Sequence, residues 1–149
     1  MMVNKIFARI HYMWGSLHRN FGNQSGFSRE HHSAVHRFTR AYELDPSFRK
    51  ARLDRGILLY REMGRLDEAV EDFDALLDID PSYSPALLNR AMLNQERGHY
   101  AEALSDLETY LDLPMEDQEY WQIATRTADL LREVVAELSE RQADQDPSE

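Results

Sequence analysis

The sequence predicts an all-α helical solenoid, because a pattern recurs about every 34 residues and each copy has the apolar spacing of two amphipathic helices. The matching segments are 44–46 with 79–81, 51–56 with 86–91, and 64–69 with 98–103. Repeats of this length are helix pairs that bury their apolar faces only by stacking on neighbours. We therefore expect about three helix pairs followed by a capping helix.

The central unit, residues 47–81, shows the pattern most clearly. A first helix is predicted over about 48–62, where Ala51, Leu53, Ile57 and Tyr60 have helical spacing. Gly64 supplies the left-handed residue that ends this helix. A second helix is predicted over about 67–79, with the apolar stripe Ala69, Val70, Phe73, Leu76 and Leu77. Pro81 and Ser82 then separate this unit from the next, because proline disfavours helix in the preceding residue and serine caps a following helix.

The third unit, residues 82–114, repeats this plan and ends at Pro114. In both units we expect small residues where two helices approach closely: Gly56, Ala69, Ala91 and Ala103. A final helix over 115–141 is predicted to cap the array, with apolar residues on one face and charged residues on the other. The polar tail, residues 142–149, is expected to be disordered.

Residues 47–114 resemble the tetratricopeptide repeat (TPR) family. The shared features are a small residue within the first helix, a glycine before the turn, an alanine early in the second helix and a closing Asp-Pro. Residues 29–46 contain a partial match to the second helix of a first unit. Several features depart from the family. The first helix of the central unit carries one extra residue, Asn94 replaces the usual aromatic residue, Pro114 arrives one residue early, and the first helix of the first unit has no recognisable motif. The resemblance implies a right-handed solenoid that binds other proteins.

Residues 1–28 are expected to form a basic amphipathic helix followed by a loop over 20–28. Its large apolar residues share one face: Val3, Ile6, Phe7, Ile10, Met13, Trp14, Leu17 and Phe21. The favoured interpretation is the first helix of a degenerate repeat, with this face and Trp14 buried against residues 34–44. The alternative is a helix that lies on an anionic membrane surface or docks on a partner. Its polar side offers a possible second contact face: Lys5, Arg9, Tyr12 and Arg19.

Charge is distributed unevenly along the chain. The formal net charge of the whole chain is −10. Residues 1–50 carry eight Lys and Arg against three Asp and Glu, a net charge of +5, and the remaining residues carry a net charge of −15. This balance makes nucleic acid an unlikely main partner, and the two ends are expected to face different surroundings, each other or a second copy. The chain has no cysteine, no apolar run of membrane-spanning length and no good secretory signal. We expect a soluble, cytoplasmic protein.

No catalytic motif is visible in the sequence. It has no glycine-rich phosphate loop and no nucleophile elbow, so we expect neither an enzyme nor a cofactor. The carboxylates of residues 67–74 are expected on an exposed helix face without a basic partner. His32 and His36, four residues apart, could share a metal, but too few ligands accompany them. We expect surface or capping roles for this histidine cluster, which also includes His31, and no metal site.

In the resembled family, the first helices of the units line a concave groove that binds peptides or helices. By position in the repeat, the groove residues would be Lys50, Asp54, Ile57 and Arg61 in the central unit, and Asn89, Met92, Gln95 and Glu96 in the third. The paired basic residues that grip chaperone C-termini are not matched, since Pro85 and Asn89 occupy their positions. If the acidic part of the chain lines the groove, a basic ligand is favoured.

The sequence therefore predicts a non-catalytic adaptor, scaffold or assembly factor. Two alternatives stay open at this point. One is a peripheral membrane-associated factor that uses residues 1–21. The other is a self-associating structural protein that pairs through the N-terminal helix or the exposed end of the final helix.

Overall fold

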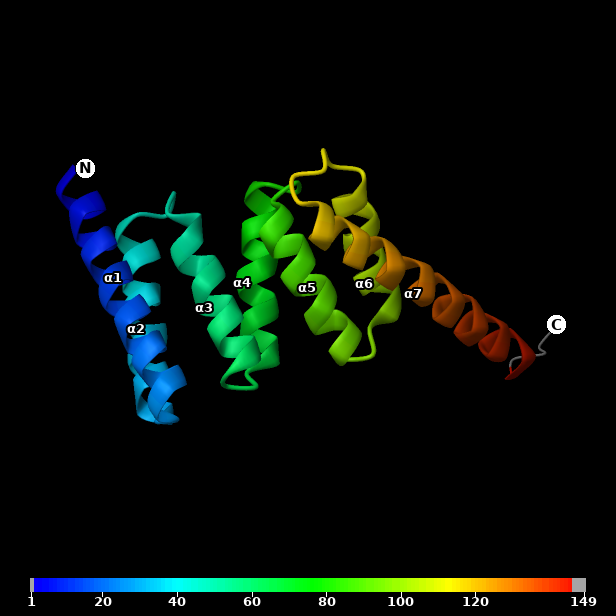
Figure 1. Cartoon of the computed structure of the whole chain (residues 1–149), viewed down its shortest axis with the longest axis horizontal. Helices are drawn as coiled ribbons and strands as arrows, with labels where there is room; N and C mark the ends of the chain where they lie inside the picture. Colours follow the sequence, from blue (N-terminus) through cyan, green and yellow to red (C-terminus); the bar gives the residue numbers. More distant parts are fainter. Residues whose placement is uncertain (1, 146–149) are drawn as a thin grey trace. The chain divides into compact units, whose positions relative to one another are not determined.

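The computed structural model describes residues 2–145, and within this range the chain forms α-helices and no strand. The helices are α1 (Met2–Ser25), α2 (Ser28–Leu44), α3 (Arg49–Arg61), α4 (Leu66–Ile79), α5 (Ser84–Glu96), α6 (Tyr100–Leu111) and α7 (Gln118–Gln145) (Figure 1). The expected all-α helical solenoid is confirmed. The chain divides into two compact units, one up to Pro81 and the other from Ser82 onward, and each is described by itself below.

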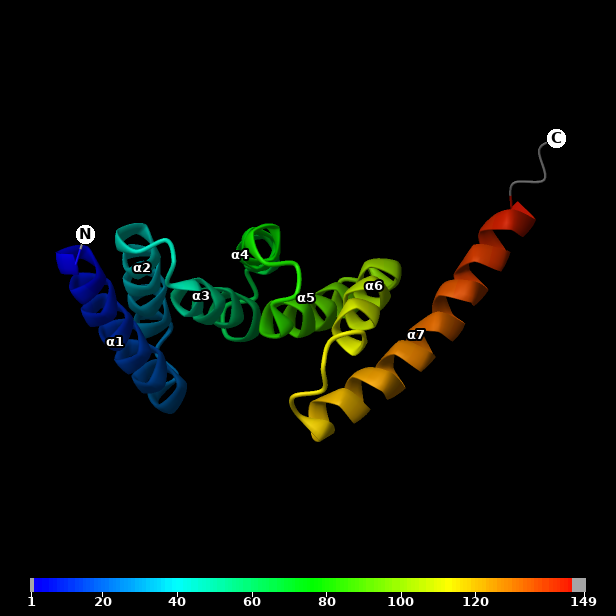
Figure 2. The same ribbon diagram turned by 90° about the horizontal axis from the view of Figure 1, so that it is seen from above.

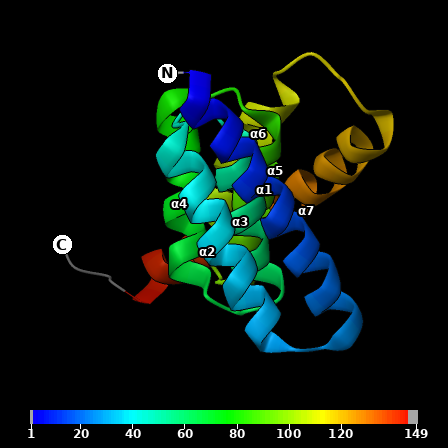
Figure 3. The same cartoon turned by 90° about the vertical axis from the view of Figure 1, so that its left-hand side faces the viewer.

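Unit 1 consists of two helix pairs, α1 with α2 and α3 with α4. Helices α1 and α2 lie side by side along most of their length (Figures 2 and 3), and α2 also packs against α3. Gly26 and Gly64 make the turns within the two pairs at φ of 71° and 62°, the left-handed region in which glycine is unstrained. The core includes Phe38 of α2 and Phe73 of α4, both fully buried.

Unit 2 contains the pair α5–α6 and the final helix α7, which packs against α6. Gly98 makes the turn between α5 and α6 at φ of 78°. The core of this unit consists of small and apolar residues that are buried: Ala86, Leu87, Ala91 and Leu93 of α5, Ala103 and Leu107 of α6, and Ala124, Ala128 and Leu131 of α7. None of the helices described between residues 2 and 145 combines the length and hydropathy needed to cross a bilayer.

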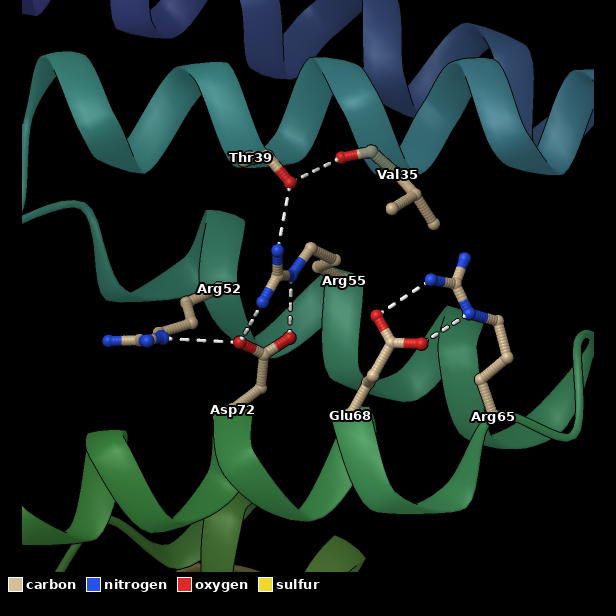
Figure 4. A network of polar contacts seen from close by, with 7 residues as sticks. All are labelled: Val35, Thr39, Arg52, Arg55, Arg65, Glu68 and Asp72. Atoms are coloured by element: carbon tan, nitrogen blue, oxygen red, sulfur yellow. Dashed lines mark hydrogen bonds and ion pairs between the residues drawn. The ribbon is translucent and has the colours of Figure 1, made fainter.

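An arginine–aspartate pair joins the two helices of a repeat in both units. In unit 1, Asp72 of α4 is fully buried, accepts two hydrogen bonds from Arg55 at 2.7 and 2.6 Å, and also pairs with Arg52 at 3.2 Å (Figure 4). In unit 2, Asp106 of α6 accepts two hydrogen bonds from Arg90 of α5 at 2.9 and 2.6 Å. The expectation that the carboxylates of residues 67–74 lack basic partners was therefore wrong for Asp72, and also for Glu68, which accepts two hydrogen bonds from Arg65, each at 2.6 Å (Figure 4). Buried charges need such partners.

Two expected boundaries differ from the structure. The predicted loop over 20–28 is mostly helix, since α1 continues to Ser25 and only Gly26 and Phe27 separate it from α2. Helix α7 continues to Gln145, so its last residues belong to the segment that we expected to be a disordered tail. Residues 146–149 of that tail lie outside the described residues.

The orientation of α1 is opposite to the favoured prediction. Its buried residues are Ala8, Gly15 and Gly22, whereas the large apolar face that we expected in the core is exposed to solvent. The reason is steric. A Cβ atom at Gly15 would lie 2.7 Å from the Cδ1 and Cε1 atoms of Phe38, so α2 approaches α1 most closely where α1 has almost no side chain. The large residues therefore point away from α2.

Candidate protein-binding surface

The two first helices of unit 1, α1 and α3, are connected by one polar cluster around Asp54. This carboxylate is 5% exposed, and Tyr12 of α1 donates a hydrogen bond to its Oδ2 atom at 2.7 Å. Two cations complete the cluster: Arg19 of α1 lies 3.5 Å from Oδ2, and Lys50 of α3 lies 3.6 Å from Oδ1. We call these four residues the Asp54 cluster. It places Tyr12 and Arg19, predicted on a second contact face, beside the predicted groove residues Lys50 and Asp54.

Aromatic contacts hold the Asp54 cluster in place. The ring of Tyr12 lies between Phe38 of α2 and Phe48 at the start of α3, with centroid separations of 5.6 and 4.9 Å. The guanidinium of Arg19 lies over the Phe38 ring at 5.9 Å, and the ammonium of Lys50 lies 6.0 Å from the centroid of Tyr12. Both distances fit cation–π interactions. The cluster is therefore rigidly supported from three helices.

The environment shifts two pKa values in this cluster. Burial, together with the hydrogen bond to Asp54 and the charge of that carboxylate, raises the pKa of Tyr12 above its ordinary value. Burial acts to lower the pKa of Lys50, but the charge of Asp54 and the neighbouring Tyr12 outweigh it and the pKa is raised. Lys50 thus keeps its positive charge while its side chain stays 60% exposed, available to a ligand.

The other predicted residues of unit 1 extend this surface along both helices. On α3, Ile57 is half-buried and Arg61 is exposed. On α1, Lys5 and Arg9 are exposed and lie close enough to Asp45 to contribute to lowering its pKa, an effect that comes first from a hydrogen bond of Ser47. Unit 1 therefore presents several cations on its first helices, while its one carboxylate in the cluster is buried and paired.

The predicted groove residues of unit 2 share one side of α5. Met92, Gln95 and Glu96 are exposed, with Met92 at 47%. Asn89 donates a hydrogen bond from Nδ2 to the carbonyl of Pro85 at 2.7 Å, and within the described chain its buried Oδ1 atom accepts none. These residues and the Asp54 cluster belong to different compact units, so each half of the predicted groove is described within its own unit and the groove as a whole stays a prediction.

The histidine cluster has structural roles, and one of them differs from expectation. His31, which we expected at the surface or in a cap, is 7% exposed and hydrogen-bonds Asn23 of α1 at 2.9 Å. His18 of α1 pairs with Glu30 of α2 at 2.7 Å, and His32 donates to the carbonyl of Ser28 at 2.8 Å. Among the residues that the structure describes, no group of three or more His, Asp or Glu is arranged to hold a metal ion.

Sequence reasoning missed the connection between Tyr12 and Asp54. The available signal was the pair Tyr12 and Arg19, which are polar, seven residues apart and on the same side of α1 as Ala8 and Gly15. A helix side that combines small residues with long polar ones suits close packing against a neighbour that carries a buried charge.

Comparison with solved structures identifies similar folds. The chain superimposes on the TPR domain of Arabidopsis OM64 with a TM-score of 0.68 and 20% identity, covering 87% of this chain and 98% of that one. The Yersinia enterocolitica type III secretion translocator chaperone SycD gives a TM-score of 0.67 at 24% identity, over 88% and 94% of the two chains. The second TPR domain of human RPAP3, solved with an HSP70 peptide, gives 0.64 at 20% identity over 84% and 98%.

Curated relatives match through part of their length only. The chain is 34% identical over 79 residues to a UDP-N-acetylglucosamine–peptide N-acetylglucosaminyltransferase of Giardia intestinalis, and 28% identical over 102 residues to a DnaJ homolog subfamily C member 7 homolog of Dictyostelium discoideum. These alignments cover 53% and 66% of this chain but 5% and 19% of the relatives.

Two family models, each described as tetratricopeptide repeat, match the chain. The first covers residues 27–84 and the second covers residues 60–127, so together they span more than half of the 149 residues. The first match includes α2, the helix that we assigned from sequence to the second half of a first repeat. The chain belongs to the tetratricopeptide repeat family.

Proposed function

We propose that this protein is a non-catalytic interaction module that holds a peptide or helix of a partner protein against the first helices of its repeats. The observation that carries the proposal is the Asp54 cluster, which fixes α1 and α3 together and presents Lys50 and Arg19 at their common surface. Rigid support of this kind lowers the entropic penalty of binding. Structures of similar fold include TPR domains in complex with HSP70 and HSP90 peptides, which supports a peptide as the ligand.

The charges of unit 1 favour an acidic ligand segment. Arg19, Lys50 and Arg61 contribute positive charge, whereas Asp54 is paired with two of these cations and shielded from solvent. A carboxylate of the ligand would meet cations without an opposing exposed acid at this cluster. This proposal reverses the expectation of a basic ligand, which depended on acidic residues lining the groove.

The proposed ligand differs from the ligands of the family members that grip the C-termini of chaperones, to which the sequence was compared above. Pro85 and Asn89 occupy positions where a paired lysine and arginine would grip a terminal carboxylate. We therefore propose that an internal acidic segment binds, and that a free C-terminus is not required.

The test is affinity capture from native lysate with the full chain and two charge-matched variants. Lys50→Glu/Arg61→Glu changes the proposed surface, and Arg29→Glu/Arg126→Glu makes the same change in charge on exposed residues of α2 and α7. We expect partner proteins that wild type and the control variant retain and the first variant loses, with unchanged circular dichroism. Hydrogen exchange of the complex should then show protection in α1 and α3. Equal capture by all three proteins would contradict the proposal.

A further inference from the structure

Helix α1 presents an apolar face that the rest of the described chain leaves open. It consists of nine large side chains, each between 42% and 79% exposed: Met2, Val3, Ile6, Phe7, Ile10, Met13, Trp14, Leu17 and Phe21. We call this surface the α1 face. Monomeric soluble proteins rarely expose a continuous apolar patch of this size, and such patches mark surfaces that bind a protein or a membrane.

The side of α1 opposite this face is already occupied. Ala8, Gly15 and Gly22 are buried there, with Gly15 against Phe38 and Gly22 against His31 of α2. An occupant of the α1 face would therefore meet no competition from α2. The fold also holds α1 as a rigid platform, because Tyr12 and Arg19 connect it to Asp54 of α3.

The pattern of the α1 face is that of a helix-pairing seam. Six of its residues alternate spacings of four and three over the helix, as in a heptad repeat: Val3, Phe7, Ile10, Trp14, Leu17 and Phe21. The spacing of this series is the same when it is read in either direction along the helix, so two copies match when they run antiparallel. An antiparallel second copy would therefore bring Val3 against Phe21, Phe7 against Leu17, and Ile10 against Trp14.

Each of these antiparallel layers combines an aromatic side chain with an aliphatic one. Volumes then remain nearly constant along the seam, which is what dense packing needs. Parallel pairing in register would instead place Phe7, Trp14 and Phe21 against their own copies, with Val3 against Val3 at one end. Large and small layers would alternate and leave gaps. The size distribution favours the antiparallel arrangement.

From this geometry we propose that the α1 face is a dimer interface, in which α1 packs antiparallel against α1 of a second copy. The nine exposed side chains offer roughly 1,000 Å² of apolar surface per protomer, and a standard stable interface buries about 800 Å² on each side. The interface is isologous and closed, so it yields a dimer without further growth. The dimer leaves the Asp54 cluster free and does not depend on the proposed ligand.

The residues beside the seam bear differently on a second copy and on a membrane surface. The positions that border the six seam residues are Asn4, His11 and His18 on one side, and Ile6, Met13 and Asn20 on the other. None of these is a lysine, arginine, aspartate or glutamate, so two identical helices can approach along the seam without repulsion between such charges. Beyond Ile6 and Met13, Arg9 lies at the edge of the α1 face, where a cation also suits a helix on anionic lipid, so the vesicle measurement below separates the two occupants.

The test is the molar mass of the full chain in solution at neutral pH, measured by light scattering and sedimentation over a wide concentration range. We expect a species of twice the chain mass of 17.5 kDa. Ile10→Glu/Trp14→Glu, which changes the central layer, should remain monomeric over the same range with its helical circular dichroism intact. The control Ile79→Glu/Met115→Glu places the same charges at residues that are 65% and 59% exposed elsewhere, and should dimerise like wild type.

Orientation is tested by disulfide cross-linking, for which the absence of native cysteine is an advantage. The Val3→Cys variant alone and the Phe21→Cys variant alone should each fail to form a disulfide-linked dimer. A mixture of the two variants should form a disulfide between Cys at position 3 of one copy and Cys at position 21 of the other. Cross-linking of each variant with itself would overturn the antiparallel arrangement. Three outcomes would overturn the dimer interface. Wild type could prove monomeric, or the dimer could survive Ile10→Glu/Trp14→Glu. The third is that wild type binds anionic vesicles as a monomer and that this variant loses the binding.

Discussion

Helices α1 and α3 occupy corresponding places in successive repeats, yet they bury different kinds of residue. Helix α3 buries Leu53, Leu58 and Leu59 together with Gly56. Helix α1 buries Ala8, Gly15 and Gly22 and turns nine large side chains outward. The apolar periodicity of α1 correctly identifies which residues share a face, but it does not determine whether that face points into the fold. The size of the residues on the opposite face of the helix determines which face points into the fold.

The two helices nevertheless use the same packing device. A Cβ atom at Gly15 would lie 2.7 Å from the ring of Phe38, and one at Gly56 would lie 2.8 Å from the ring of Phe73. In each of these two repeats, a buried aromatic ring of the second helix packs against a glycine of the first helix. The difference is that α3 also packs large residues around its glycine, because it is flanked by α2 as well as by α4.

The largest expected contrast is between two phenylalanines of the first repeat. Phe38→Ala removes a fully buried ring and should lower the free energy of unfolding by about 3–5 kcal/mol. Phe7→Ala removes a ring that is 50% exposed, and at concentrations where the chain is monomeric it should change stability by less than about 1 kcal/mol. Urea unfolding followed by circular dichroism measures both. Similar losses would mean that the α1 face is packed inside the fold.

A smaller effect is expected from the two glycines that face aromatic rings. Alanine is favoured over glycine within a helix by about 1 kcal/mol, but a Cβ atom at either site must displace a buried ring. Gly15→Ala and Gly56→Ala should therefore each be net destabilising, by about 1–3 kcal/mol. Asn20→Ala, at an exposed position of α1, serves as the control and should be neutral or stabilising. If Gly15→Ala also stabilises the protein, α1 does not pack against Phe38.

The contribution of the Asp54 cluster should be smaller still. Tyr12→Phe removes one hydrogen bond to a buried carboxylate that keeps two cationic partners, and should lower the free energy of unfolding by about 1–2 kcal/mol. Tyr120→Phe, at a residue that is 59% exposed, is the matched control and should have little effect. Equal effects of the two substitutions would argue against a connection between α1 and α3.

Tyr12 also predicts that the free energy of unfolding depends on pH in the alkaline range. Burial and Asp54 raise the pKa of Tyr12 in the folded state above its ordinary value of 10.0. The unfolded state therefore loses this proton first, so the stabilisation is complete below pH 10.0 and is lost as the pH rises through the folded-state pKa. Tyr12→Phe should lose less stability than wild type on going above that pH. An identical alkaline decline in both proteins would show that the Tyr12 proton is not coupled to folding.

Sequence predicted the repeated part of the fold well, because its signals are local. Gly64 and Gly98 mark turns, Ala69 and Ala103 mark close approaches, and these were read from spacing alone. The orientation of α1 could not be derived in this way, since it depends on the contact between Gly15 and the distant Phe38. The same holds for the site: Lys50 and Asp54 were identified by their place in the repeat, but their link to Tyr12 is a tertiary contact. The binding roles of these residues stay predictions.

The most direct test of the outward-facing α1 is the environment of Trp14, measured by acrylamide quenching in a Trp121→Phe background where it is the sole tryptophan. Dilute protein, or the same protein with Ile10→Glu, should show readily quenched, red-shifted emission, because Trp14 is 50% exposed in the single chain. Concentrating the protein without Ile10→Glu should shift the emission to the blue and protect it as α1 pairs with its copy. Emission that stays shielded in dilute and Ile10→Glu protein alike would contradict the account, because Trp14 would then lie in the core of its own chain.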